Sequence, residues 1–345
     1  MAAPYAGSMT SPSFGPEPAD APPLRWGILA PGGVARTFAR DVPAHTQSRI
    51  VAVGSRSRER AHAFASEFDI PTAHGSYADL VADPQVEAIY IASPHSEHRD
   101  HARLALEAGK PVLVEKSITR NAAEAREIFD LARERRLFVM EAMWTRFLPH
   151  MVALREVLTN GEIGDVVTLT AEHGQALDLP PEHRLKNPEL VGGALLDLGV
   201  YPVSFAHDML GVPDAITAVG TYTETGVDGN EAIVLRYGTR TLALLSSTLW
   251  SATPNGAVIS GTKGRIEVAP TFYAPSSFTV RLLEGEPRTV TVEVSGGFQY
   301  EAAEVARRIH AGELESSLHT WEDTLAVMST MDQVRAQLGV LYPGE

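Results

Sequence analysis

An apolar run that breaks into a turn of small residues limits the fold of this chain more than any other feature. Residues 24–36 read LRWGILAPGGVAR, and a second apolar run follows from Ile50 to Val53. The order is a strand, a turn of small residues, a helix and a second strand. Because such a crossover joins parallel strands, the segment predicts the start of a parallel sheet covered by helices.

The same alternation continues to about Met143. The continuous apolar run Ala88–Ala92 is typical of a strand buried on both faces. We therefore predict an α/β fold whose first domain, residues 24–143, is a Rossmann-type doubly wound parallel sheet. The expected strands are Trp26–Leu29, Ile50–Gly54, Ala88–Ala92, Pro111–Val114 and Leu137–Glu141, and the expected helices are Gly33–Asp41, Arg58–Phe68, His98–Ala108 and Asn121–Arg136.

Beyond residue 143 the pattern changes to short apolar runs separated by turns. They predict an α+β domain over residues 144–345 with a large, mostly antiparallel, open sheet. Its expected strands are Val166–Glu172, Ile216–Thr223, Glu231–Tyr237, Leu242–Leu249, Ala257–Ser260, Arg265–Val268, Phe278–Leu283 and Thr289–Val294. Its expected helices are His150–Leu158, Gly192–Leu210, Tyr300–Ala311 and Trp321–Leu338.

Composition removes several classes of function. The formal net charge of −14 argues against binding to a nucleic-acid backbone, and the absence of cysteine excludes disulfides and thiolate catalysis. The twelve histidines show no metal-ligand spacing, so no metal is expected. No apolar run approaches the roughly 20 residues of a membrane span. Residues 1–23, rich in Ala, Pro, Ser and Gly, are interpreted as a flexible arm without signal-peptide character, and a cytoplasmic location is expected.

The turn after the first strand has the small residues that a bound dinucleotide requires. Ala30, Gly32 and Ala35 stand at the three fingerprint positions, and Gly33 and Val34 open the helix. A helix start offers free N–H groups and a positive dipole end to a pyrophosphate. The alternative is an ordinary glycine turn in an α/β protein.

The end of the second strand carries cations and hydroxyl groups where an NAD enzyme would carry a carboxylate. Ser55, Arg56, Ser57, Arg58 and Arg60 can donate hydrogen bonds to a 2′-phosphate, which a carboxylate would repel. The segment therefore predicts NADP as the cofactor. The alternative is a solvated helix start without a ligand.

A later strand ends in Ser93 and Pro94, followed by His95 and His98. Ligands of doubly wound sheets lie at the carboxyl ends of the strands, so both histidines are candidates to flank the nicotinamide. In the alternative interpretation Ser96 caps a helix and His98 is exposed.

Two further pairs are candidates for chemistry. Glu115 and Lys116 follow a buried strand and would face the same crevice as the cofactor, although such a pair more often lies on the surface. Asp197 and Tyr201 are four residues apart and would share one face of a helix. The alternative for the latter pair is a buried helix with a satisfied aspartate.

Together these segments resemble the glucose–fructose oxidoreductase / inositol dehydrogenase family (Gfo/Idh/MocA). The resemblance rests on GILAPGGVA at residues 27–35, Ser93-Pro94 with His98, GKPVLVEK at residues 109–116, and residues 193–201. The segments MEAMWTRFLP at residues 140–149, Arg184-Leu185 and DLGVYP at residues 197–202 are most similar to the dimeric dihydrodiol dehydrogenase / NADP-dependent D-xylose dehydrogenase branch. The chain departs from the family at Ser117, where a proline shapes the backbone after the lysine, and at Ala30, which replaces a glycine.

The resemblance implies oxidation of a secondary alcohol or sugar hemiacetal, with hydride passing to the nicotinamide. Lys116 and Tyr201 are the candidates to take or relay the hydroxyl proton. Both side chains titrate near about 10 in isolation, so burial of the lysine and a nearby ammonium beside the tyrosine are expected to lower their pKa values. Asp197 is expected to hold a substrate hydroxyl or to orient Lys116.

The resemblance also implies that Trp144, Arg146 and Arg184 shape the substrate pocket, and that Trp144 and Arg146 reach the cofactor. It further implies a homodimer formed through the open sheet. Two other functions stay open at this point: a ketoreductase of a nucleotide-linked keto sugar, and a non-catalytic NADP-sensing regulator.

Overall fold

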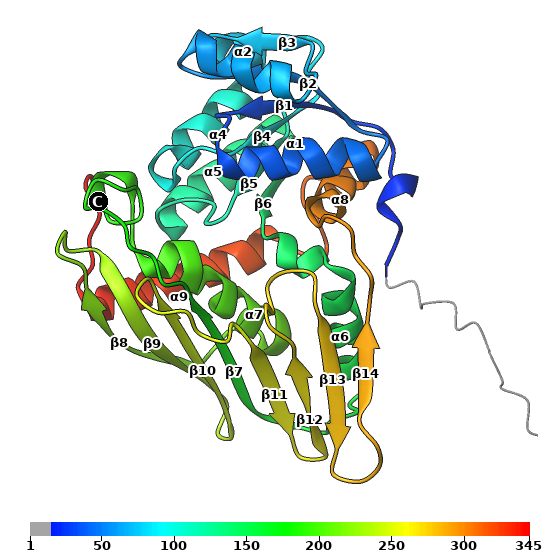
Figure 1. The fold of residues 1–345 in the computed structure, drawn as a ribbon, viewed down its shortest axis with the longest axis vertical. Helices are drawn as coiled ribbons and strands as arrows, with labels where there is room; N and C mark the ends of the chain where they lie inside the picture. The colour runs from blue at the N-terminus through cyan, green and yellow to red at the C-terminus, as the bar shows by residue number, and fades with distance from the viewer. Residues whose placement is uncertain (1–14) are drawn as a thin grey trace, which may run out of the picture.

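The structure, a computed structural model, describes residues 15–345 and contains two sheets (Figure 1). The first sheet has six strands in the order β3-β2-β1-β4-β5-β6, and every neighbouring pair is parallel. Its strands are β1 (Arg25–Leu29), β2 (Arg49–Gly54), β3 (Thr72–His74), β4 (Ala88–Ile91), β5 (Val112–Glu115) and β6 (Val139–Ala142). The predicted doubly wound parallel sheet is confirmed.

Helices cover both faces of this sheet. They are α1 (Gly33–His45), α2 (Arg58–Glu67), α3 (Tyr77–Ala82), α4 (His98–Glu107) and α5 (Ala122–Arg135). Polar caps fix several of these starts, as where Ser57 accepts from the amide of Arg60 and Asn121 accepts from that of Glu124. The short elements β3 and α3 were not predicted, because neither is long enough to show a periodic pattern.

The second sheet has eight strands in the order β14-β13-β12-β11-β7-β10-β9-β8, and only the pair β7–β10 is parallel. The predicted, mostly antiparallel sheet is therefore confirmed. Its strands are β7 (Val166–Gly174), β8 (Ala215–Tyr222), β9 (Asp228–Tyr237), β10 (Thr241–Thr248), β11 (Ala257–Gly261), β12 (Gly264–Val268), β13 (Ser277–Leu282) and β14 (Arg288–Thr291).

Helices from the second half of the chain cover one face of this sheet and join it to the first domain (Figure 1). They are α6 (Pro149–Thr159), α7 (Val200–Leu210) and α9 (Trp321–Leu338), and α9 packs on both α5 and β8. The segment Pro188–Leu210, with a mean hydropathy of 1.3, has the length and apolar character of a membrane span, contrary to the expectation from sequence. Since 89% of its apolar 18-residue window is buried inside the protein, it serves as a core segment.

The chain returns to the first domain near its end, which the division at residue 144 did not anticipate. Helix α8 (Phe298–His310) packs on α1 and buries apolar side chains in the core of the parallel sheet. The short helix η1 (Pro18–Asp20) packs in turn on α8, and Arg307 donates to the carbonyl of Glu17 at 2.6 Å. The interpretation of residues 1–23 as a flexible arm is therefore wrong for residues 15–23, and residues 1–14 lie outside the described part of the chain.

Candidate active site

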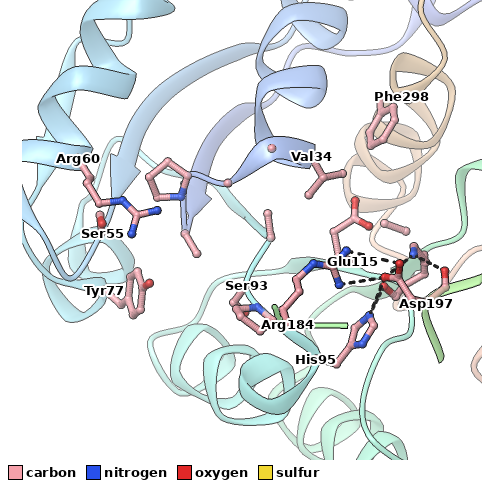
Figure 2. A pocket seen from close by; sticks show the side chains of 18 of the residues that line it. Val34, Ser55, Arg60, Tyr77, Ser93, His95, Glu115, Arg184, Asp197 and Phe298 are labelled. Carbon is pink, nitrogen blue, oxygen red and sulfur yellow. Dashed lines mark hydrogen bonds and ion pairs between the residues drawn. The ribbon is translucent and has the colours of Figure 1, made fainter. Parts of the chain in front are cut away.

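A cavity of about 700 Å³ opens at the carboxyl ends of β1, β2, β4 and β5 and is closed by residues from the second half of the chain (Figure 2). Doubly wound sheets bind their ligands at this edge. The residues predicted for the site that line it are Ala30, Gly32, Gly33, Val34, Ser55, Arg56, Ser57, Arg60, Ser93, Pro94, His95, Glu115, Lys116, Trp144, Arg184, Asp197 and Tyr201. The structure places Arg58, His98 and Arg146 outside this lining.

The first turn presents an uncapped helix start to the cavity. Gly32 stands at the N-cap of α1 and supplies no side-chain acceptor, so the first amides of the helix have no side-chain cap. Ala30 has a φ of +69°, a left-handed conformation that usually requires glycine, and its carbonyl accepts from the amide of Gly32 at 2.9 Å. Free amides and a positive helix end at one edge of a cavity suit an anion such as a pyrophosphate.

Two cations without acidic partners lie beside the end of β2. Arg56 and Arg60 line the cavity, and neither forms an ion pair with any residue in the range 15–345. Tyr77, from the unpredicted helix α3, lines the same region, where the charges of Arg56 and Arg60 act on its hydroxyl. Figure 2 shows Arg60, Ser55 and Tyr77 grouped at one end of the cavity, far from Asp197. Guanidinium groups without an acidic partner among the described residues can bind an anion at this end.

Lys116 and Asp197 meet at the opposite end of the cavity. The Lys116 Nζ donates to the main-chain carbonyl of Asp197 at 2.8 Å and lies 3.4 Å from its Oδ1 atom. Arg184 approaches the same carboxylate, with Nη1 3.1 Å from Oδ1. Burial favours protonation of Asp197, but the ammonium of Lys116 and the guanidinium of Arg184 outweigh it and hold the pKa well below its usual range. Asp197 is therefore an anion that orients Lys116.

Tyr201 faces the lysine through its ring. The Lys116 Nζ lies 5.1 Å from the centroid of the Tyr201 ring. Burial, with the nearby Glu115 and Asp197 carboxyls, raises the pKa of Tyr201 well above its ordinary value. The expectation that a nearby ammonium lowers this pKa is wrong, because burial and the two carboxyls together raise it.

Glu115 is buried beside these groups. Its carboxylate accepts a hydrogen bond from the hydroxyl of Tyr90 on β4. Burial raises the pKa of Glu115 to about 7, while the Tyr90 hydroxyl and the Lys116 ammonium oppose that rise. The interpretation of Glu115 and Lys116 as a surface pair is therefore wrong.

The two histidines after β4 have different environments. His95 lines the cavity with its Nε2 3.1 Å from the Lys116 carbonyl, and burial lowers its pKa to about 3. His98 is fully buried, and its ring nitrogens lie 2.8 Å from the Ser93 carbonyl and 2.9 Å from the Ser117 carbonyl. His98 thus neither lines the cavity nor is exposed, and Ser96 caps no helix. Through its contact with the Ser117 carbonyl, His98 supports the loop that carries Lys116.

Arg146 is the clearest departure from the expected site. The short helix η3 (Trp144–Phe147) directs Trp144 to the cavity but buries Arg146 to 4% exposure elsewhere. There its Nη1 lies 3.6 Å from Asp323 and 3.9 Å from Asp208.

Phe298 of α8 is a lining residue that sequence reasoning missed, and its ring centroid lies 5.1 Å from that of Trp144. Phe298 reaches the cavity because α8 returns to the first domain, and no local sequence pattern predicts that return.

No cluster of residues suited to a metal ion occurs within residues 15–345. The cavity instead combines an anion-binding helix start, two free cations and a lysine–tyrosine–aspartate group. This combination is that of a dinucleotide-dependent oxidoreductase with a Rossmann domain.

Comparison with known proteins gives the family. Residues 24–143 match the model of the oxidoreductase family with an NAD-binding Rossmann fold (GFO_IDH_MocA), and residues 151–267 match the GFO/IDH/MocA C-terminal domain. The chain is 38% identical to the D-xylose 1-dehydrogenase (NADP(+)) of Hypocrea jecorina, with 93% of each chain covered. It is also 38% identical to the trans-1,2-dihydrobenzene-1,2-diol dehydrogenase of Mus musculus, with 93% of this chain and 98% of the relative covered. The chain therefore belongs to the Gfo/Idh/MocA oxidoreductase family.

A solved structure agrees in fold. The 3-ketoreductase KijD10 of Actinomadura kijaniata, in complex with NADP and TDP-benzene, is 26% identical with a TM-score of 0.82, covering 92% of this chain and 98% of its own. An aldose–aldose oxidoreductase of Caulobacter crescentus shares the fold at 22% identity with a TM-score of 0.84, covering 92% and 97%.

Proposed function

We propose that this protein is an NADP-dependent dehydrogenase that oxidises a CH–OH group of a sugar or vicinal diol, as D-xylose 1-dehydrogenases and trans-dihydrodiol dehydrogenases do. The observation that supports this proposal best is the layout of one cavity. Unpaired Arg56 and Arg60 lie at one end, and Lys116 with Asp197 and Tyr201 lies at the other. The first group suits the 2′-phosphate of NADP, and the second suits a hydroxyl that must lose its proton.

The residues that line the cavity fit NADP, because an uncapped helix start lies between the cations and the lysine. NADP, when bound, accepts a hydride from the substrate carbon at C4 of its nicotinamide. The overall change converts the alcohol and NADP⁺ into the carbonyl compound, NADPH and one proton. Lys116 and Tyr201 are the groups placed to accept or relay that proton, and Asp197 keeps Lys116 directed at the cavity.

The test is to incubate the purified protein with NADP and a panel of aldoses and trans-diols while following the absorbance of the reduced cofactor. We expect turnover with a member of the panel and much weaker turnover with NAD. Tight binding of NADP without turnover of any alcohol would instead support the NADP-sensing regulator. The presence of Lys116, Asp197 and Tyr201 in one cavity argues against the regulator.

The likeness to KijD10 favours a ketoreductase of a nucleotide-linked sugar as the second candidate. Such a substrate carries a diphosphate, which needs cations on the substrate side of the cavity. Arg184 is the sole Lys or Arg that the second half of the chain, residues 144–345, contributes to the lining, and it is already paired with Asp197. We therefore place this activity second, and reduction of a nucleotide-linked keto sugar by NADPH would reverse that order.

We also propose a homodimer formed through the uncovered face of the second sheet. Side chains alternate along β9 and β10, and those that point away from the helices include Val234, Leu242 and Leu244, which are 36%, 42% and 45% exposed. Exposed apolar side chains on an uncovered sheet face are typical of a self-complementary interface. A mass measurement in solution should give a dimer that Leu244→Glu converts to a monomer. A cytoplasmic location is proposed on the absence of cysteine.

A further inference from the structure

The segment that carries Asp197 is a single π-helical turn, η5 (Leu195–Gly199), followed directly by α7. The sequence predicted a regular helix here. Single π-turns inside helices are rare and often occur at functional sites. The contacts of this turn therefore bear on how Asp197 and Tyr201 reach the cavity.

Side chains from other elements bind three successive carbonyl groups of this turn. Ser117 Oγ donates to the carbonyl of Leu196 at 3.0 Å, and Lys116 Nζ donates to that of Asp197 at 2.8 Å. The carbonyl of Leu198 accepts from His173 Nδ1, which lies 3.2 Å away on β7. The turn is thus held by the loop after β5 on one side and by the second sheet on the other.

The start of the turn is fixed as well. Asp228 on β9 is fully buried, and its Oδ2 accepts from the amide of Leu195 at 2.6 Å. Gly193 makes this approach possible, because it has a φ of +126° and a Cβ there would collide with the Asp228 carboxylate. A turn bound at its start and at three carbonyls has little freedom to rotate.

We propose that Ser117 is a positioning residue that keeps Lys116 and Asp197 in register. This inference rests on the proposed dehydrogenase function. Lysine has a long flexible side chain, so its bond to Asp197 alone leaves the two segments free to pivot. The adjacent bond from Ser117 to Leu196 adds a second attachment point, and two neighbouring bonds fix an orientation that one bond cannot.

Ser117 fits this role because it is fully buried and does not line the cavity. Its carbonyl also lies 2.9 Å from Nδ1 of His98, the first residue of α4, so Ser117 joins the start of α4 to the π-turn. Ser117 stands where the family has a proline, and its hydroxyl supplies a bond that proline lacks.

The test compares Ser117→Ala with the parent enzyme in single-turnover experiments. Stopped-flow measurement of NADP reduction gives a rate constant for hydride transfer that does not depend on how much of the protein is folded. Since small misplacements of reacting groups cost up to about 100-fold in rate, we expect this rate constant to fall about tenfold. The dissociation constant for NADP should stay within about twofold, because Ser117 touches no cofactor-lining surface.

Thr46→Val is the matched control. Thr46 is also buried and donates its hydroxyl to a main-chain carbonyl, that of Val42 at 2.7 Å, but it lies at the far end of α1. We expect this variant to lose stability without any change in the single-turnover rate constant. An unchanged rate constant in Ser117→Ala, or a lower amplitude alone, overturns the positioning role. A parent enzyme that turns over no sugar or diol refutes the proposed function itself, and with it this inference.

Discussion

Reversal of charge at Arg56 tests the assignment of NADP most directly. Arg56 and Arg60 line the cavity, and no acidic side chain within residues 15–345 is paired with either. A hydrogen bond between a guanidinium and a phosphate contributes about 1.5–3 kcal/mol, which corresponds to a factor of roughly 10 to 150. Arg56 is exposed, so solvent screening places its contribution to binding at the lower end of this energy range.

Arg56→Asp adds a second effect to the lost bond. The new carboxylate repels a 2′-phosphate and can accept from the 2′-hydroxyl of NAD, as carboxylates at this position do in NAD enzymes. We therefore expect the ratio of kcat/KM for NADP to that for NAD to fall by about 100-fold, with Arg60 retaining part of the affinity for the phosphate. Steady-state kinetics with both cofactors at fixed ionic strength measure the ratio, since added salt weakens exposed charge pairs.

Arg58→Asp is the matched control for this experiment. Arg58 is the first residue of α2, is exposed, and lies two positions from Arg56, yet it does not line the cavity. Its substitution changes the net charge by the same amount without removing a group from the anion subsite. If both variants shift the cofactor ratio equally, the effect is one of general charge and the reasoning about Arg56 is refuted.

Two other predictions follow from the buried groups. Lys116→Ala and Tyr201→Phe should each lower kcat by about 100-fold or more, as loss of an acid–base group does, and near-full turnover in both would show that the proton passes elsewhere. His150 is fully buried, and burial lowers its pKa to about 4. Below its ordinary pKa the unfolded chain takes up a proton that the folded protein does not, so acidification destabilises the fold. Between about pH 7 and pH 5 this one group should cost about 2 kcal/mol of unfolding free energy. Denaturant unfolding should show His150→Leu losing less stability than the parent over that interval, and equal losses would contradict this account.

The sequence predicts most of the fold because periodicity reports burial. The strand Ala88–Ile91 is fully buried and reads as a continuous apolar run, while β9 alternates because one face is open. The sequence did not predict the features that depend on contacts between residues far apart in the chain. Helix α8 packs on α1, which lies far from it in the sequence. The amphipathic pattern of α8 predicts a buried face but does not predict which element covers that face.

The site was predictable where it depends on topology. The carboxyl ends of parallel strands meet at one edge of the sheet, so Ser55, Ser93 and Lys116 lie around one cavity. Arg146 and Tyr77 show the limit of this argument. Both depend on short helical segments, η3 and α3, whose direction is set by packing, and these turn Arg146 inward and Tyr77 toward the cavity.

The direction of the pKa shift of Tyr201 could not be predicted from the sequence for a related reason. The spacing of Asp197 and Tyr201 predicts a shared helix face, but it does not say which charge the ammonium of Lys116 will satisfy. The π-turn brings the carbonyl and carboxylate of Asp197 to Lys116 Nζ, which leaves the lysine above the Tyr201 ring face. Burial, with the Glu115 and Asp197 carboxyls, decides the outcome and raises the pKa of the Tyr201 phenol.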